Sequence, residues 1–171
     1  MSLIATVGGV YPANTYSGKA WEAQRILPPM TLGQRATSIL KTGSLPVLLK
    51  ARVFAYTGDG LTVNIYRDPV YTGGVPDPVY NMSSLSTSVL ESQLLVGFTL
   101  TGDGTPVAAT MSLIGPASAQ GAGSVLSRFG SNRVLAPNTS YLLTFTSLSN
   151  AQTVTARLEF FEGIMDYSTL D

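Results

Sequence analysis

The chain has 171 residues, a length that suits one domain built around a single hydrophobic core. It contains neither Cys nor His, which excludes disulfides, thiolate metal sites and catalytic arrangements that need a histidine base or a cysteine nucleophile. Ten basic residues balance ten acidic ones, so no net charge attracts the chain to nucleic acid or to an anionic membrane.

The first 35 residues differ from the rest because their apolar residues follow no period. Pro28 and Pro29 argue against a central strand, and residues 20–26 suggest at most a turn or two of helix. We therefore predict an extended N-terminal arm over residues 1–35, followed by a β-sandwich domain over residues 36–171.

Aromatic residues and methionine are enriched in the cores of protein interfaces, which makes an arm that carries them a candidate docking segment. The candidate docking residues are Tyr11, Tyr16, Trp21 and Met30. The alternative is that Trp21 and its neighbours pack onto the sandwich of their own chain.

From residue 36 onward, short alternating apolar runs are separated by Gly, Pro, Asn and Asp, as in strands and turns. The predicted strands are residues 36–42, 47–56, 61–67, 94–100, 107–114, 133–135, 140–146 and 153–161. The last is the cleanest, with Val154, Ala156, Leu158 and Phe160 on one face.

The strand over residues 47–56 is predicted to place Val47 and Leu49 on one face and Phe54 and Tyr56 on the other. The strand over residues 140–146 alternates except in its middle. Because no convincing helical stripe is present, we predict an all-β fold: a two-sheet antiparallel β-sandwich, jelly-roll-like, with an extended N-terminal arm.

Two Gly-Asp-Gly triplets, at residues 58–60 and 102–104, each follow an apolar strand. Glycine readily adopts positive φ, so each triplet predicts a tight hairpin or a bulged three-residue loop. A single Asp in each triplet supplies too few oxygen ligands for calcium.

Without His or Cys, the most plausible catalytic chemistry left is glycoside hydrolysis by paired carboxylates. The carboxylates considered are Asp59, Asp68, Asp77, Glu91, Asp103 and Glu159. Their spacing does not require a shared site, and most fall at predicted turns or on polar strand faces. We predict no enzymatic activity, no cofactor and no metal. The basic residues are dispersed, so we also expect no nucleic-acid partner.

Charged residues make up only 12% of the chain, about half of the usual 25%, and the mean hydropathy is +0.24. No run of 18 apolar residues could cross a bilayer, because Lys50 and Arg52 interrupt the most apolar stretch. We therefore expect no membrane partner. A surface with so few charges resists self-association poorly, and we favour a chain that works within a larger assembly. The alternative is a Ser/Thr/Gly-rich β protein that neutral polar groups keep in solution.

Residues 133–162 read as strand, Pro-Asn turn, strand, polar turn and final strand. Pro137 fixes φ at the first corner, and Asn138 can bond its own backbone. Tyr141 starts the next strand and can direct its hydroxyl back across the corner, as tyrosine corners do. Pro137, Asn138 and Tyr141 are the candidate structural corner.

This segment resembles small virion proteins of tailed bacteriophages that decorate the capsid. The resembling residues are Leu135, Pro137, Asn138, Thr139, Tyr141, Leu142 and Leu143, with Phe160, Phe161 and Glu162 at the end. A looser similarity covers residues 63–70 and 78–82. Together these segments touch about half of the chain, which departs from the family in residues 1–35 and in the loop over residues 115–124.

The resemblance implies a jelly-roll-like sandwich on the exterior of a phage capsid, with no catalytic residues. It implies the major capsid protein as partner and a homo-oligomer, with a trimer favoured. The alternative function is a tail- or head-fibre module that recognises host-surface carbohydrate. For that role Tyr66, Tyr71 and Tyr80 would have to lie near Asp68 and Asp77 as an aromatic platform with acidic partners.

Overall fold

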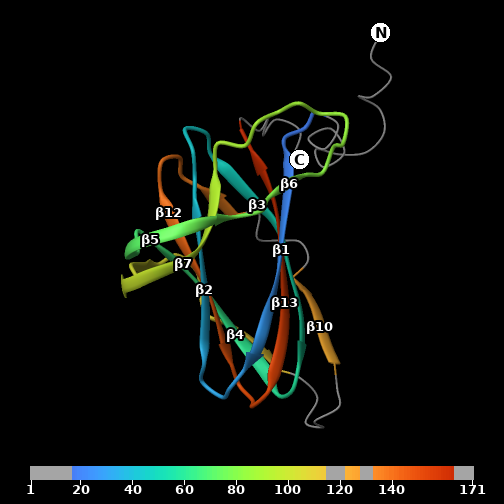
Figure 1. Ribbon diagram of the computed structural model, residues 1–171, viewed down its shortest axis with the longest axis vertical. Helices are drawn as coiled ribbons and strands as arrows, with labels where there is room; N and C mark the ends of the chain where they lie inside the picture. The colour runs from blue at the N-terminus through green and yellow to red at the C-terminus, as the bar shows by residue number, and fades with distance from the viewer. Residues whose placement is uncertain (1–16, 115–121, 128–132, 164–171) are drawn as a thin grey trace.

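The structure is a computed structural model that describes residues 17–114, 122–127 and 133–163 (Figure 1). In this part of the chain every regular element is a β-strand, and the strands form two antiparallel sheets packed face to face. The predicted all-β, two-sheet sandwich is therefore confirmed.

Sheet A contains β1 (Ala20–Met30), β3 (Val47–Thr57), β6 (Tyr80–Asn81), β10 (Ala122–Ser127), β11 (Arg133–Leu135) and β13 (Gln152–Glu162). Its strand order is β10-β3-β13-β1-β6, and β11 also pairs with β3. Sheet B contains β2 (Arg35–Lys41), β4 (Gly60–Arg67), β5 (Val70–Asp77), β7 (Gln93–Gly102), β8 (Thr105–Pro106), β9 (Met111–Ile114) and β12 (Ser140–Ser147). Its strand order is β5-β7-β2-β12-β4-β8, and β9 also pairs with β4.

The connectivity of these sheets is that of a jelly roll. Sheet A has the order β1-β13-β3-β10 and sheet B the order β2-β12-β4-β9, so strands from the two ends of the chain lie side by side. Between β4 and β8 the chain inserts β5, β6 and β7, which add to both sheets. We call residues 68–104 the insertion.

The predicted arm over residues 1–35 is wrong for residues 20–30, which form β1 instead of an arm or a helical turn. This strand pairs with β13 from Ala20 to Leu27. The prolines are tolerated because β6, the described strand on the other side of β1, pairs only with Trp21 and Glu22. Pro28 and Pro29 thus lie on an open edge, at a register shift of β1.

The core lies between the two sheets. Val154, Leu158 and Phe160 of β13 are buried in it, and Ala156 packs against it, as the alternation predicts. On β3, however, the register passes from Glu159↔Ala51 to Phe160↔Leu49, which leaves Lys50 as an extra residue.

This bulge reverses the alternation of β3. Val47 and Leu49 on one side of it and Phe54 and Tyr56 on the other side all belong to the same core cluster. The prediction that Leu49 and Phe54 face opposite ways is therefore wrong, because one extra residue moves every later side chain to the other face.

The two Gly-Asp-Gly triplets lie at short connections between strands, but neither closes a hairpin, because β3 and β4 belong to different sheets and β8 pairs with β4 instead of β7. Gly58 and Gly60, with φ of 83° and 149°, join β3 to β4, and Gly104, with φ of 86°, lies between β7 and β8. In the predicted loop over residues 115–124, residues 122–124 belong to β10, and residues 115–121 lie outside the described residues.

Candidate interaction surface

The predicted corner between β11 and β12 connects distant parts of the chain. The backbone N–H of Ala136 donates a 2.9 Å hydrogen bond to the hydroxyl of Tyr141. Asn138 adopts a φ of 50°, and its backbone N–H donates a 2.7 Å bond to the carbonyl of Gly43. The corner therefore fixes the connection between β2 and β3 as well as its own, which is a structural role.

The insertion forms a ribbon that crosses the outer face of sheet B. Only the first three residues of β7, Gln93 to Leu95, pair with β2, and the rest of β7 pairs with β5 alone. Gly73, Gly74 and Gly97 have positive φ of 71°, 109° and 65° where the ribbon bends. Figure 1 shows β5 and β7 running across β2 and β12 instead of along them.

The ribbon covers an apolar patch on the outer face of sheet B. Ile39, Leu142 and Leu95 are buried in this patch. The side chains that pack against them are half-buried: Tyr66, Tyr71, Phe98 and Leu100. The rings of Tyr71 and Phe98 meet edge to face at 5.8 Å, and the Tyr71 hydroxyl lies 3.3 Å from the Ser140 hydroxyl.

Packing of this kind occupies two of the three tyrosines considered for carbohydrate binding. Tyr66 and Tyr71 share the outer face of sheet B, whereas Tyr80 lies on β6 of sheet A. Asp77 pairs with Arg25, and Asp68 pairs with Arg67. The structure does not bring the five residues of that platform together.

The chain crosses between the sheets at the end of the sandwich where β1 begins and β13 ends (Figure 1). The crossing loop, residues 82–92, exposes Leu85 to 93% and Val89 to 85%. Beside it lies a cavity of about 410 Å³, lined by Trp21, Leu45, Val89 and Glu162 among others. We call the loop and this cavity the apical surface.

A buried carboxylate holds the crossing loop in place. The Glu162 carboxylate accepts hydrogen bonds from the backbone N–H groups of Glu91 and Ser92, at 2.9 and 2.7 Å, and from the Ser92 hydroxyl at 2.5 Å. The N–H of Met82 donates to the Ala20 carbonyl at 2.9 Å, which ties the start of the loop to β1. The apical surface is therefore attached to the sandwich at both ends of the loop.

A second carboxylate ties the loop to the segment before β3. The Glu91 carboxylate accepts bonds from the hydroxyl and the backbone N–H of Ser44, at 2.6 and 2.9 Å. The bond from the Ser44 hydroxyl, followed by that from its N–H, lowers the pKa of Glu91 below its usual value of 4.5.

The predicted docking residues do not form an exposed set. Trp21 and Met30 are 6% and 1% exposed and belong to the core of their own chain, so the prediction that they stand on an exposed arm is wrong. The alternative, that Trp21 packs onto its own sandwich, holds. Part of Trp21 still lines the apical cavity. Tyr11 and Tyr16 lie outside the described residues.

The carboxylates considered for catalysis are mostly paired within the chain. Asp103 contacts Arg35 at 2.9 Å, and Glu159 contacts Arg157 at 3.0 Å, whereas Glu91 is bonded to Ser44. Within the described ranges, no three acidic side chains are grouped to hold a metal ion. The described chain also contains no helix long and apolar enough to cross a membrane.

Sequence reasoning missed the apical surface. The signal was present in Leu85 and Val89, two large apolar residues within a Ser/Thr-rich stretch that has no strand or helix period. Because Leu85 and Val89 belong to no periodic segment, the sequence assigns them to no buried strand or helix face.

In comparisons with known proteins, no family model, no curated protein and no solved structure matches this chain.

Proposed function

We propose that this chain is a structural virion protein of a tailed bacteriophage that decorates and stabilises the outer surface of the capsid. In this proposal it contacts the major capsid protein and its own copies, as a homo-oligomer with a trimer favoured. The observation that carries the proposal is the apical surface, where Leu85 and Val89 are almost fully exposed beside a cavity. Large apolar side chains gathered at one exposed site are typical of an interaction surface.

The segments that resemble phage decoration proteins also have clear roles in this fold. Tyr141 closes the corner before β12, and Glu162 holds the crossing loop that presents Leu85 and Val89. The resemblance therefore falls on residues that build the sandwich and position the apical surface.

Repetition on a lattice would strengthen weak individual contacts. A capsid presents many identical sites, and a decoration oligomer that bridges adjacent subunits binds by several contacts at once. Because such a protein binds only the assembled lattice, mass action stabilises that lattice. Under these conditions each individual contact can be made by a few apolar side chains.

Co-sedimentation with capsids of the phage that encodes the chain tests the proposal. The double variant Leu85→Ser, Val89→Ser should bind about 10- to 100-fold more weakly, since each buried apolar side chain contributes roughly 1 kcal/mol or more. The control is Ile114→Ser, which removes an 82% exposed side chain opposite Gly60, at the other end of the sandwich. Equal binding by the double variant and the wild type would contradict the proposed surface, and a wild type that never pellets would contradict the function.

A truncation can test whether the first residues contribute. Deletion of residues 1–16 retains every described strand, whereas deletion of residues 1–30 removes β1 and its pairing with β13. Only the shorter deletion can therefore report on docking. Weaker capsid binding by a folded chain that lacks residues 1–16 would add this segment to the docking surface.

The alternative function, a fibre module for host-surface carbohydrate, has one specific observation in its favour. Tyr80 is 63% exposed on β6, close to the start of the crossing loop, and an exposed aromatic ring can stack on a sugar. A glycan array that detects binding by the wild type but not by Tyr80→Ala would favour this alternative over capsid decoration.

A further inference from the structure

The arginines of this chain divide into two groups. Six of them lie in the described residues, and four pair with carboxylates of the same chain. The pairs are Arg25–Asp77, Arg35–Asp103, Arg67–Asp68 and Arg157 with Glu22 and Glu159. For Arg52 and Arg133, no carboxylate of the described chain lies within ion-pair distance.

Strand pairing places these two arginines close together on the inner side of sheet A. Arg52 of β3 lies opposite Leu158 of β13. It is two residues before the buried Phe54 and so lies on the same face of the strand. Arg133 opens β11, lies opposite Leu49 of β3, and alternates with the buried Leu135. Both side chains therefore point toward the space between the sheets.

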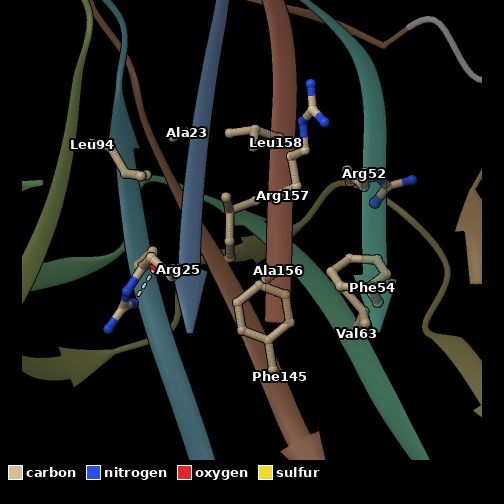
Figure 2. Close-up of a pocket in the computed structure, with 12 residues that line it drawn as sticks. Ala23, Arg25, Arg52, Phe54, Val63, Leu94, Phe145, Ala156, Arg157 and Leu158 are labelled. Carbon is tan, nitrogen blue, oxygen red and sulfur yellow. Dashed lines mark hydrogen bonds between the residues drawn. The ribbon is translucent and has the colours of Figure 1, made fainter. Parts of the chain in front are cut away.

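Arg52 lines the cavity between the sheets, which also touches Arg25 from β1 (Figure 2). The Arg25 guanidinium is satisfied by the Thr37 carbonyl at 2.9 Å, the Ser38 hydroxyl and Asp77. Arg133 donates one hydrogen bond, to the Val107 carbonyl of the sheet B edge. Arg52 has no such partner in the described part of the chain.

The electrostatics agree with this geometry. Burial, followed by the charge of Arg133, lowers the pKa of Arg52 below its usual value. Two partly desolvated cations side by side repel each other, and the attraction of a nearby anion would offset this repulsion and part of the desolvation cost.

We propose that Arg52 and Arg133 form a binding site for a carboxylate group of another molecule. Guanidinium groups can bind carboxylates through paired, charge-assisted hydrogen bonds. Every other arginine in the described residues forms an ion pair with a carboxylate. The adjoining cavity, of about 30 Å³, is lined by Arg52 and mostly by apolar side chains but not by Arg133, and it has room for about two water-sized atoms.

Thermal unfolding of the full chain in sodium acetate and in sodium chloride of equal ionic strength tests this site. Acetate should raise the Tm of the wild type by about 2–4 °C over chloride, because a ligand that binds only the folded state stabilises it. Arg52→Gln and Arg133→Gln should each lose most of this rise. The control Arg67→Gln, which alters an exposed pair with Asp68, should keep it.

The variants should fold well enough to be compared. In chloride the Tm of Arg52→Gln should equal or exceed that of the wild type, because the substitution removes a half-buried charge that lacks a counter-charge. An acetate response of equal size in the wild type and in Arg52→Gln would overturn the proposal. A larger Arg52-dependent rise in sulfate than in acetate would also overturn it, in favour of a tetrahedral oxyanion.

The oligomeric mass, measured over a range of protein concentrations, identifies the source of the carboxylate. Self-association that Arg52→Gln weakens assigns the carboxylate to a second copy of the chain. A monomer that shows the Arg52-dependent acetate response assigns it to a different molecule. The acetate test needs no capsid, so its failure is independent of the proposed virion function.

Discussion

The outer faces of the two sheets differ, although both belong to the same sandwich. On sheet A this face is polar along the middle of β13, where Arg157 bridges Glu22 of β1 and Glu159. Only near the apical surface does it bury apolar side chains: Ala20, Leu48 and Phe161, with Met82 packed against them. On sheet B the corresponding face buries Ile39 and Leu142 under the ribbon of the insertion. Sheet B is thus covered on both faces under the ribbon, whereas the outer face of sheet A is covered only at its apical end.

This difference explains the composition of β12 and β13, two strands that follow each other in the chain but belong to different sheets. On β13, up to Phe160, Thr155, Arg157 and Glu159 alternate with core residues, as expected where only one face of a strand is buried. On β12, Tyr141, Leu142 and Leu143 are buried in succession, because Leu142 lies under the ribbon while its neighbours face the core. The insertion therefore explains why apolar and polar residues do not alternate in the middle of β12.

Truncation of a side chain under the ribbon should have the largest effect. Leu142→Ala should lower the free energy of unfolding by about 3 kcal/mol, since it removes a fully buried side chain and leaves a cavity. Thr155→Ala on the outer face of sheet A is the matched control and should cost less than about 1 kcal/mol. Urea unfolding measures both. Similar values for the two variants would mean that the ribbon does not cover sheet B in solution.

Loss of the carboxylate that anchors the insertion should have the next largest effect. Glu162→Gln places an amide where three donors from Glu91 and Ser92 converge, which should cost about 2 kcal/mol. Hydrogen exchange should then accelerate at Glu91 and Ser92 first. Unchanged exchange at these amides would contradict the anchoring role.

Truncation of a half-buried ring on the ribbon should act more locally. Phe98→Ala removes the contact with Tyr71 and should cost about 1.5 kcal/mol. Hydrogen exchange should rise along β5 and the second half of β7, while β13 stays protected. Uniform acceleration over both sheets would show instead that the ribbon and the sandwich unfold as one unit.

The smallest effect should appear in the pH dependence. The pKa of Glu91 is lower in the folded chain than in the unfolded one, so its bonds to Ser44 stabilise the fold above about pH 4.5. This stabilisation is lost as the pH falls through that value toward the folded pKa. Urea unfolding at several pH values should show a weaker acid destabilisation in Glu91→Gln than in the wild type, and identical profiles would contradict the assignment.

Sequence reasoning predicted the fold class because most strands alternate and end at Gly, Pro or Asn. It missed β1, whose prolines lie on an edge that its pattern alone does not reveal. It missed β5 because Gly73, Gly74 and Pro76 weaken a strand pattern, and here the glycines mark the bend of the ribbon. The bulge at Lys50 became visible only from the register of β3 against β13.

The candidate surface was harder to predict than the fold. The exposure of Leu85 and Val89 follows from the path of the crossing loop, which depends on hydrogen bonds over about 70 residues from Glu162. The proximity of Arg52 and Arg133 likewise depends on the pairing of β11 with β3. Contacts between residues so far apart in the chain leave no local pattern.

The path of the insertion has a mechanical consequence. The chain leaves sheet B after β5, pairs with β1 through β6, and returns to sheet B at β7. The path from β5 through β6 to β7 therefore connects the two sheets at the end that carries the apical surface. A load applied there would be transmitted to both layers, since the chain passes from sheet B to β1 of sheet A and back.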